Sequence, residues 1–129
     1  MAEKILVVDD EPEVGAVIVD SLREAGYTPE IVDDSVAALS LISATTYDLI
    51  VSDVAMPGLT GLQLLALIKE RQPSPEVILI TAYSTEEVAA QALERGAFGY
   101  LGKPFEVDDL LERVKQALWK RRLALRGTA

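Results

Sequence analysis

The sequence contains neither cysteine nor histidine, and these two absences remove most of the common site chemistries. Without cysteine the chain can form no disulfide scaffold, no thiolate metal site and no thiol nucleophile, which fits a reducing compartment. Without histidine it has no imidazole base and no histidine-ligated zinc. Any chemistry must therefore use carboxylates, hydroxyls and lysine.

Positive charge is also scarce, because 12 lysines and arginines stand against 21 aspartates and glutamates, for a formal net charge of -9. Phosphate backbones require a basic surface, so we expect no direct nucleic-acid contact by this domain. No segment approaches the roughly 20 apolar residues of a membrane span. The N-terminus also lacks the basic and apolar regions of a signal peptide. We therefore expect a cytoplasmic protein without membrane contact.

The 129 residues, of which 50% are hydrophobic, suffice for one domain with one core. Apolar runs alternate with segments of helical spacing five times along the chain. Continuous apolar runs at 5–8, 49–51 and 77–80 are typical of strands that are buried on both faces of a parallel sheet. Two further strands are expected around 30–32 and at 98–101.

Boundary residues predict a helix after each strand. Pro12 can start the first helix, and Gly26 can end it in a left-handed conformation. Asp33, Asp34 and Ser35 are cap candidates for the second helix. The remaining helices are expected over 62–68, before Pro73 and Pro75, from the capping box Ser84–Glu87 to Gly96, and from about Glu106 to Leu125.

Strands that alternate with helices imply a parallel sheet covered on both faces, with right-handed crossovers. Five such units form a single doubly wound α/β sheet, because the chain is too short for an eight-fold barrel. In such a sheet the functional crevice lies beyond the carboxyl ends of the strands. The residues at those ends are Asp9 and Asp10 after the first strand, Asp53 after the third, Thr81 after the fourth and Lys103 after the fifth.

Three of these carboxylates meet if the first and third strands are neighbours. Uncompensated, each pair repels by up to about 4 kcal/mol at roughly 4 Å and an effective dielectric constant of about 20. A Mg²⁺ ion offsets such repulsion, since it takes oxygen ligands and usually accepts one or two carboxylates with water and a phosphate oxygen. One carboxylate oxygen would remain as a nucleophile. Thr81 and Lys103 could supply a hydroxyl donor and a positive charge to phosphoryl oxygens.

These residues resemble the motifs of response-regulator receiver domains in two-component signalling, and the resemblance covers roughly Glu3 to Leu118. It implies a flavodoxin-like sheet of strand order 2-1-3-4-5. Further likeness, at 81–84 and 96–101, is to receivers attached to ATPase-type transcription activators or hybrid sensor kinases. The motifs that match are, in chain order, Val8-Asp9-Asp10, Asp53 with Met56-Pro57-Gly58 and Gly61, Thr81-Ala82, and Lys103-Pro104. For the last of these the resemblance implies a cis-proline bond.

The resemblance also implies a role for each residue of the acidic group. Asp53 would accept a phosphoryl group from the phosphohistidine of a histidine kinase or a histidine phosphotransfer protein. Asp10, Asp53 and the backbone carbonyl of Ala55 would bind Mg²⁺ directly, and Asp9 would act through a water molecule. Such a domain is a signalling switch, not a turnover enzyme, because it catalyses only its own phosphorylation and autodephosphorylation.

In the same family pattern, Lys103 and Thr81 hold the phosphoryl oxygens. On phosphorylation Thr81 would move inward, and Tyr100 would follow from a solvent-facing to a buried position. The surface of the fourth helix, fifth strand and fifth helix would then change and control an output domain or partner protein. Ala55 and Tyr83 depart from the commonest pattern, so we hypothesise an acyl-phosphate lifetime different from that of receivers with polar side chains there.

Three other functions compete with this interpretation. A phosphatase with an aspartyl intermediate would need a second acid-base carboxylate two residues after Asp53, where Ala55 stands. A nucleotide or flavin binder would need a glycine-rich first turn, but 9–12 is acidic and contains no glycine. A phosphorylation-independent protein-binding module would keep the same fold without the chemistry.

The site residues also have ordinary structural interpretations when they are taken one at a time. The pair Asp9-Asp10 could cap a helix, and Thr81 could be a common strand-end residue. Tyr100 would more often belong to the core, and Lys103 could be a solvated loop residue. The combination, with complementary chemical roles at one sheet edge, favours a functional site.

Two further acidic pairs resemble Asp9-Asp10 in composition alone. Asp33-Asp34 and Asp108-Asp109 stand at expected helix starts. Capping and the helix dipole explain carboxylates at such positions. We therefore interpret both pairs as structural.

Residues 119–129 form a basic extension of the receiver-like part, 1–118. A cationic helix end is explained first by the helix dipole. Alternatively, the helix continues as a linker to a missing effector domain or as a dimerising stalk, which would make the protein a homodimer. The stalk contacts would be Trp119, Leu123 and Leu125. The residues that make the end of the last helix basic are Lys115, Lys120, Arg121, Arg122 and Arg126.

Overall fold

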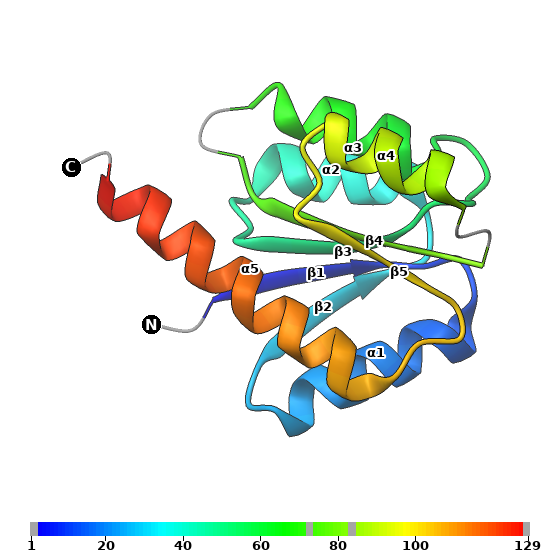
Figure 1. Ribbon diagram of the computed structural model, residues 1–129, viewed down its shortest axis with the longest axis horizontal. Coiled ribbons are helices and arrows are strands. Elements are labelled where there is room, and N and C mark those ends of the chain that lie inside the picture. The colour runs from blue at the N-terminus through cyan, green and yellow to red at the C-terminus, as the bar shows by residue number, and fades with distance from the viewer. Residues whose placement is uncertain (1–2, 72–73, 83–84, 128–129) are drawn as a thin grey trace.

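The computed structural model describes residues 3–71, 74–82 and 85–127. Within them, five parallel strands form one sheet in the order β2-β1-β3-β4-β5, and a helix follows each strand (Figure 1). The expected fold and strand order are therefore confirmed. The strands are β1 (Lys4–Val8), β2 (Thr28–Val32), β3 (Leu49–Asp53), β4 (Glu76–Thr81) and β5 (Gly99–Gly102). The helices are α1 (Pro12–Glu24), α2 (Ser35–Ala44), α3 (Gly61–Lys69), α4 (Glu86–Glu94) and α5 (Val107–Gly127).

The sheet is covered on both faces, by α1 and α5 on one side and by α2, α3 and α4 on the other (Figure 1). Alternate residues of a strand point to opposite faces. In β1, Ile5 and Val7 join the core under α1 and α5, whereas Leu6 and Val8 join the core under the other three helices. All four side chains are fully buried. Burial on both faces explains why the central strands are continuous apolar runs.

The strand β2 lies at the edge of the sheet and had the weakest sequence signal. It begins at Thr28, two residues before the expected segment, and pairs in parallel with β1. Most of its side chains are exposed or half-buried, and Ile31 is 45% exposed. An edge strand of this kind needs fewer apolar residues than a central one, so its pattern is harder to read from the sequence.

Helix boundaries follow local capping chemistry. Asp34 caps α2, since its Oδ1 accepts hydrogen bonds from two following backbone N–H groups at 2.6 and 3.2 Å. Thr85 caps α4 through its side-chain oxygen. Gly26 takes the expected left-handed conformation after α1, with φ of 97°. Ser84 and Pro73, expected as boundary residues, lie outside the described residues.

The last helix, α5, is 21 residues long and extends beyond the sheet (Figure 1). Its buried stripe ends at Arg121, and the side chains at 122–126 are exposed. Trp119 and Leu123 are 54% and 48% exposed. In the part of the chain that the structure describes, no helix combines the length and apolar character needed to cross a membrane.

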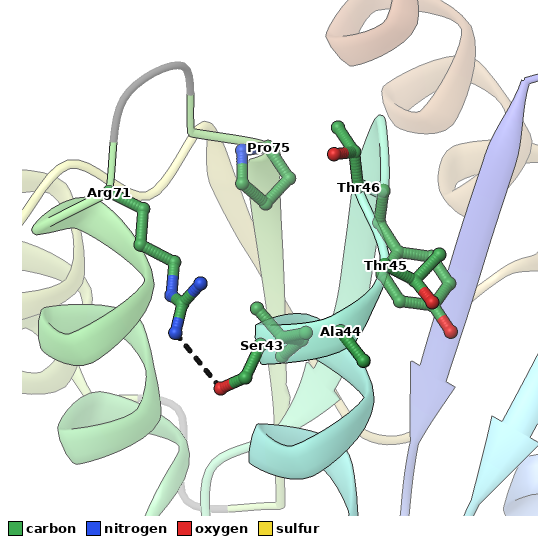
Figure 2. A pocket seen from close by; sticks show the side chains of 8 residues that line it. Ser43, Ala44, Thr45, Thr46, Arg71 and Pro75 are labelled. Atoms are coloured by element: carbon green, nitrogen blue, oxygen red, sulfur yellow. Dashed lines mark hydrogen bonds between the residues drawn. The ribbon is translucent and has the colours of Figure 1, made fainter.

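A small pocket opens at the edge of the sheet where the strands begin, between the end of α2 and the segment before β4 (Figure 2). Arg71 Nη2 donates a hydrogen bond to Ser43 Oγ at 2.9 Å (Figure 2). The Tyr47 hydroxyl donates to a Glu30 carboxylate oxygen at 2.8 Å, and burial together with this bond raises the pKa of Tyr47 to about 12. The polar groups of Arg71 and Tyr47 are therefore already engaged within the fold.

Candidate functional site

The carboxyl ends of β1 and β3 bring two buried aspartates together. Val8, the last residue of β1, lies opposite Ser52 in β3. The residues that follow, Asp9 and Asp53, therefore share one edge of the sheet. Their exposed fractions are only 1% and 3%. Asp10 follows in the loop after β1 and is half-buried.

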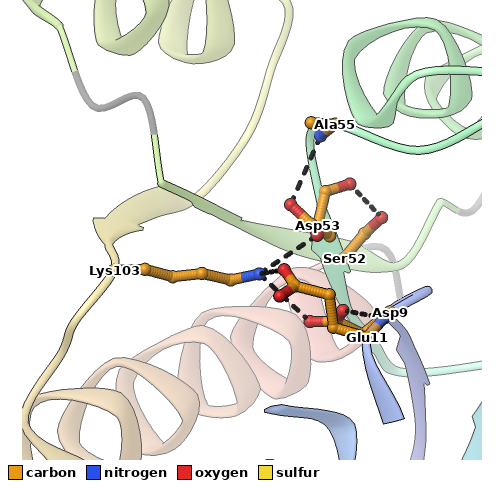
Figure 3. A network of polar contacts seen from close by, with 6 residues as sticks. All are labelled: Asp9, Glu11, Ser52, Asp53, Ala55 and Lys103. Atoms are coloured by element: carbon orange, nitrogen blue, oxygen red, sulfur yellow. Dashed lines mark hydrogen bonds and ion pairs between the residues drawn. The ribbon is translucent and has the colours of Figure 1, made fainter. Parts of the chain in front are cut away.

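Lys103 reaches this pair from the loop after β5 (Figure 3). Its backbone N–H donates to the carbonyl of Thr81 at 2.7 Å, which holds the start of the loop beside the end of β4. The Nζ atom lies 3.1 Å from Asp53 Oδ2 and 3.6 Å from Asp9 Oδ2. The peptide bond between Lys103 and Pro104 is cis, as the resemblance implied.

Four carboxylates form a compact cluster at this edge. Asp9, Asp10, Glu11 and Asp53 each offer an oxygen, and these oxygens all lie within 4.8 Å of one another. Asp9 Oδ2 is buried and has no hydrogen-bond partner among the described residues. A buried carboxylate oxygen without such a partner is costly, and a hard cation such as Mg²⁺ is bound by oxygen ligands. The donor set therefore fits Mg²⁺.

The ionisation of the cluster follows from burial and charge. Burial raises the pKa of the Asp9 carboxyl, although the hydrogen bond from the Glu11 N–H at 2.8 Å opposes the rise. Burial lowers the pKa of Lys103, but hydrogen bonds to Glu11 and Asp53 and the charges of the nearby carboxylates outweigh it. The net result is a Lys103 pKa above its usual range. Lys103 therefore keeps its positive charge at neutral pH.

The sequence family described as response regulator receiver domain matches residues 5–115 of this chain. The chain belongs to the receiver family. The response regulator protein FleR of Pseudomonas aeruginosa is 41% identical over 114 residues, which are 88% of this chain and 24% of that protein. The DNA-binding transcriptional regulator NtrC of Escherichia coli (strain K12) is 38% identical over the same shares. The chain thus spans about a quarter of the length of these curated relatives.

Solved receiver structures have the same fold. The beryllofluoride-activated NtrC4 receiver domain dimer has a TM-score of 0.86 and 34% identity, covering 92% of this chain and 98% of that chain. NtrX from Brucella abortus has a TM-score of 0.90 and 32% identity, covering 99% of this chain and 29% of that chain. Together with NtrC, these proteins confirm the expected similarity to receivers of transcription regulators.

Three further residues of the expected receiver site lie at the end of β4, in the loop after β3 and in β5. Thr81 is the buried last residue of β4, one position beyond Ile80, which is the register partner of Asp53. Ala55 lies in the loop after β3, and its N–H donates to Asp53 Oδ1 at 3.3 Å. Tyr100 lies in β5, is half-buried, and packs against the core under α2, α3 and α4. Its change from a solvent-facing to a buried position stays a prediction.

Sequence reasoning assigned no role to Glu11. Its Oε1 accepts a hydrogen bond from Lys103 Nζ at 2.8 Å, shorter than the distances from this atom to Asp53 and Asp9 (Figure 3). Glu11 stands at the N-cap position of α1, but its side chain makes no capping hydrogen bond. The one sequence signal was its place directly after Asp9-Asp10, because a contact between residues 92 positions apart has no local pattern.

The other acidic pairs are not among the four clustered carboxylates of the described residues, although Asp33 and Asp34 line a pocket together with Asp10. Asp34 serves as the cap of α2, which confirms a structural role for this member of the first pair. Asp108 and Asp109 lie in the first turn of α5, where the helix dipole favours carboxylates.

The basic residues near the end of α5 form ion pairs with distant acids. Arg122 Nη2 lies 2.9 Å from Glu3 Oε2, at the start of the chain. Arg121 Nε lies 3.5 Å from Asp48 Oδ1, just before β3. Lys120 also pairs, at 3.5 Å, with the first residue of β4. These contacts give part of the basic segment a structural role that neither the dipole nor the stalk interpretation included.

Proposed function

We propose that this receiver is a phosphorylation switch in which Asp53 accepts a phosphoryl group from the phosphohistidine of a histidine kinase or histidine phosphotransfer protein. The strongest support is the position of buried Asp53 between Lys103 Nζ at 3.1 Å and the Ala55 N–H at 3.3 Å. In the transfer, an Asp53 oxygen attacks phosphorus and the phosphorus–nitrogen bond of the donor breaks. The imidazole nitrogen of the donor takes up a proton from water as it leaves.

The neighbouring residues prepare Asp53 for this step. Asp10, Asp53 and the backbone carbonyl of Ala55 would hold Mg²⁺ directly, and Asp9 would contribute through a water molecule. When bound, the ion neutralises negative charge on the carboxylates and on the transferred group. Lys103 supplies positive charge to the phosphoryl oxygens and the Thr81 hydroxyl supplies a donor. Because Glu11 shares Lys103, it must release part of that contact when the phosphoryl group arrives.

An open groove beside Lys103 supports docking of a donor protein. The groove has a volume of about 540 Å³ and lies between α1 and the loop that joins β5 to α5. Val17 and Val107, which line it, are 49% and 38% exposed. Such an apolar face next to the phosphoacceptor suits contact with another protein, since exposed apolar patches mark interaction sites.

The output of the switch is proposed to be the surface of α4, β5 and α5. Thr81 ends β4, and Tyr100 lies in the neighbouring β5. Arg113 from α5 donates to the Tyr100 carbonyl at 2.6 Å, so a shift of β5 is passed directly to α5. Moving a 1:99 population to 99:1 takes about 5.5 kcal/mol of preference. Thr81 and Lys103 must therefore contact the phosphoryl oxygens differently in the two states.

We further propose that 119–129 connects the receiver, 1–118, to an effector domain or to a second copy of the chain. The exposed Trp119, Leu123 and Leu125 offer the contact surface. The related NtrC4 receiver was solved as a dimer. Sedimentation of the phosphorylated and unphosphorylated protein tests self-association, and a monomer in both states would exclude the second copy.

The first test of the switch is intact mass after incubation with a small acyl-phosphate donor, with and without Mg²⁺. We expect a Mg²⁺-dependent gain of one phosphoryl group that is lost in Asp53→Asn. No gain under any condition would instead favour a phosphorylation-independent binding module on the same fold.

The lifetime of the phosphorylated state is proposed to depend on Ala55. Its exposed side chain offers no polar atom two residues after Asp53, and Tyr83, the second departure, lies outside the described residues. Ala55→Asn should change the autodephosphorylation rate, measured by loss of phosphorylated mass after removal of the donor. Equal rates in variant and parent would reject this dependence.

A further inference from the structure

The loop that follows Asp53 is tied to the start of α2 by a buried serine. Ser35, the first residue of α2, is fully buried although its side chain is polar. Its hydroxyl donates to the carbonyl of Pro57 at 3.2 Å and accepts a hydrogen bond from the N–H of Leu59 at 3.0 Å. These partners lie 22 and 24 residues away in the sequence, on either side of Gly58.

The loop carries backbone groups of the site and is anchored at its base. The Val54 N–H donates to the Ile80 carbonyl at 2.9 Å, and the Gly61 N–H donates to the Val54 carbonyl at 2.8 Å. Beyond these base contacts, the loop meets Ser35 at Pro57 and Leu59, and the Met56 side chain is buried in the core. The serine therefore acts on the part of the loop that the base contacts do not reach.

The serine hydroxyl serves this loop and not its own helix, because Asp34 already caps α2. The fit is close, since a Cβ added at Gly58 would lie 3.3 Å from Ser35 Oγ. Removal of the hydroxyl would leave the Pro57 carbonyl and the Leu59 N–H without this partner. Without the hydroxyl, these two backbone groups must bond to water or the loop must change its conformation.

We propose that Ser35 is a positioning residue for the phosphorylation site. Its hydroxyl holds the loop so that the Ala55 carbonyl and the Asp53 carboxylate form a prearranged set of Mg²⁺ ligands. This inference rests on the proposed function. Removing contacts that orient metal ligands typically changes metal affinity about 10- to 100-fold. Ser35 acts through the loop backbone, so we expect the lower end of this range.

The test compares Ser35→Ala with Ser43→Ala, a control on the same helix. At the opposite end of α2, the Ser43 hydroxyl accepts a hydrogen bond from Arg71 (Figure 2) and donates to the Leu39 carbonyl. Mg²⁺ affinity is measured by calorimetry, and hydrogen exchange is followed at the Leu59 amide. Ser35→Ala should weaken Mg²⁺ binding about 10-fold and speed exchange at Leu59, whereas Ser43→Ala should leave both unchanged.

A dependence of phosphorylation on Mg²⁺ concentration separates positioning from general damage. The Ser35→Ala protein should be phosphorylated more slowly than the parent at low Mg²⁺ and should approach the parental rate at saturating Mg²⁺. Parental Mg²⁺ affinity in Ser35→Ala, or an equal loss in Ser43→Ala, would overturn the positioning role while the parent still takes up a phosphoryl group. A parent that takes up none would overturn the proposed function and this inference together.

Discussion

The two edges of the sheet both gather charged side chains, but they differ in charge balance. At the carboxyl edge, four carboxylates of the described residues cluster together, and three of them form ion pairs with Lys103. At the amino edge, bases and acids of the described residues are nearly equal in number. The groups that meet there are Glu76 and Asp48 with Lys69, Lys120 and Arg121.

This difference in charge balance distinguishes the candidate site at the carboxyl edge from the structural contacts at the amino edge. The amino-edge cluster holds elements together, because Arg121 of α5 also donates to the Ser74 carbonyl at 3.0 Å before β4. Burial there lowers the pKa of Lys69, with the charge of Glu76 opposing the change. The carboxyl-edge cluster keeps excess negative charge, which destabilises the fold unless a cation binds. The excess negative charge at the carboxyl edge thus indicates a functional site, whereas the balanced charges at the amino edge indicate a structural role.

The largest expected effect is on the phosphorylation rate and comes from removing the positive charge of Lys103 at the carboxyl edge. Lys103→Met should slow phosphorylation of Asp53 about 100- to 1000-fold, because a fixed donor to the developing charge is lost. Time-resolved intact mass with a small acyl-phosphate donor measures the rate. Lys69→Met at the amino edge is the matched control and should keep the parental rate. Equal slowing in both variants would contradict the distinction between the edges.

The next effect is on stability and belongs to the amino edge. Arg121→Met should lower the free energy of unfolding by about 1–3 kcal/mol, because the Ser74 carbonyl and the Asp48 carboxylate lose a buried partner. Urea denaturation measures it, and phosphorylation should proceed at the parental rate. Arg126→Met, at an exposed position of the same helix, is the control. A stability loss no greater than in that control would remove the structural role of Arg121.

A third effect depends on pH and tests whether the buried carboxylate of Asp9 destabilises the fold. The pKa of Asp9 is raised, so its contribution to stability is present below its ordinary value of 3.8 and is lost as pH rises through the raised value. In EDTA, Asp9→Asn should therefore be more stable than the parent at neutral pH, and the difference should shrink as the solution is acidified. Urea titrations across this range measure it. If Asp9→Asn is less stable than the parent at neutral pH, burial of the ionised Asp9 carboxylate does not dominate its effect on the free energy of unfolding.

The smallest effect concerns Glu11, which is more than half exposed and competes for Lys103. Exposed ion pairs contribute about 0.2–1 kcal/mol, so Glu11→Gln should speed phosphorylation by about 1.5- to 5-fold. The same mass assay at fixed Mg²⁺ measures the change. Glu13→Gln, in the first turn of α1, controls for the loss of a negative charge near the groove. Slower phosphorylation would mean that Glu11 supports Lys103 in place of competing with it.

Most of the fold followed from the sequence because its signals are local. The buried strands were visible as apolar runs, and Gly26 marked the end of α1. The expected start of β2 was two residues late, since an exposed edge strand has a weak apolar pattern. The cap of α4 is Thr85, one of four polar residues in the expected box. Boundaries of this kind depend on which of several suitable side chains meets the helix end.

The site was predictable to the extent that parallel strands bring their carboxyl ends together. That rule placed Asp9, Asp53, Thr81 and Lys103 at one edge. It could not predict the hydrogen bond between Lys103 and Glu11, because a long side chain at the end of β5 can reach several acids. The rule also gave no indication of the hydrogen bonds between Ser35 and the loop after β3, because they join the start of a helix to a loop.

The sequence by itself determined the doubly wound sheet, the edge that carries the chemistry and the acidic character of that edge. Apolar periodicity, caps and strand-end residues act within a few positions, so they can be read without coordinates. Tertiary structure decided which acid holds Lys103, which Asp9 oxygen lacks a hydrogen-bond partner among the described residues, and that Arg121 is a buried structural cation. These features join residues dozens of positions apart, and their geometry depends on side-chain reach and packing that no local pattern specifies.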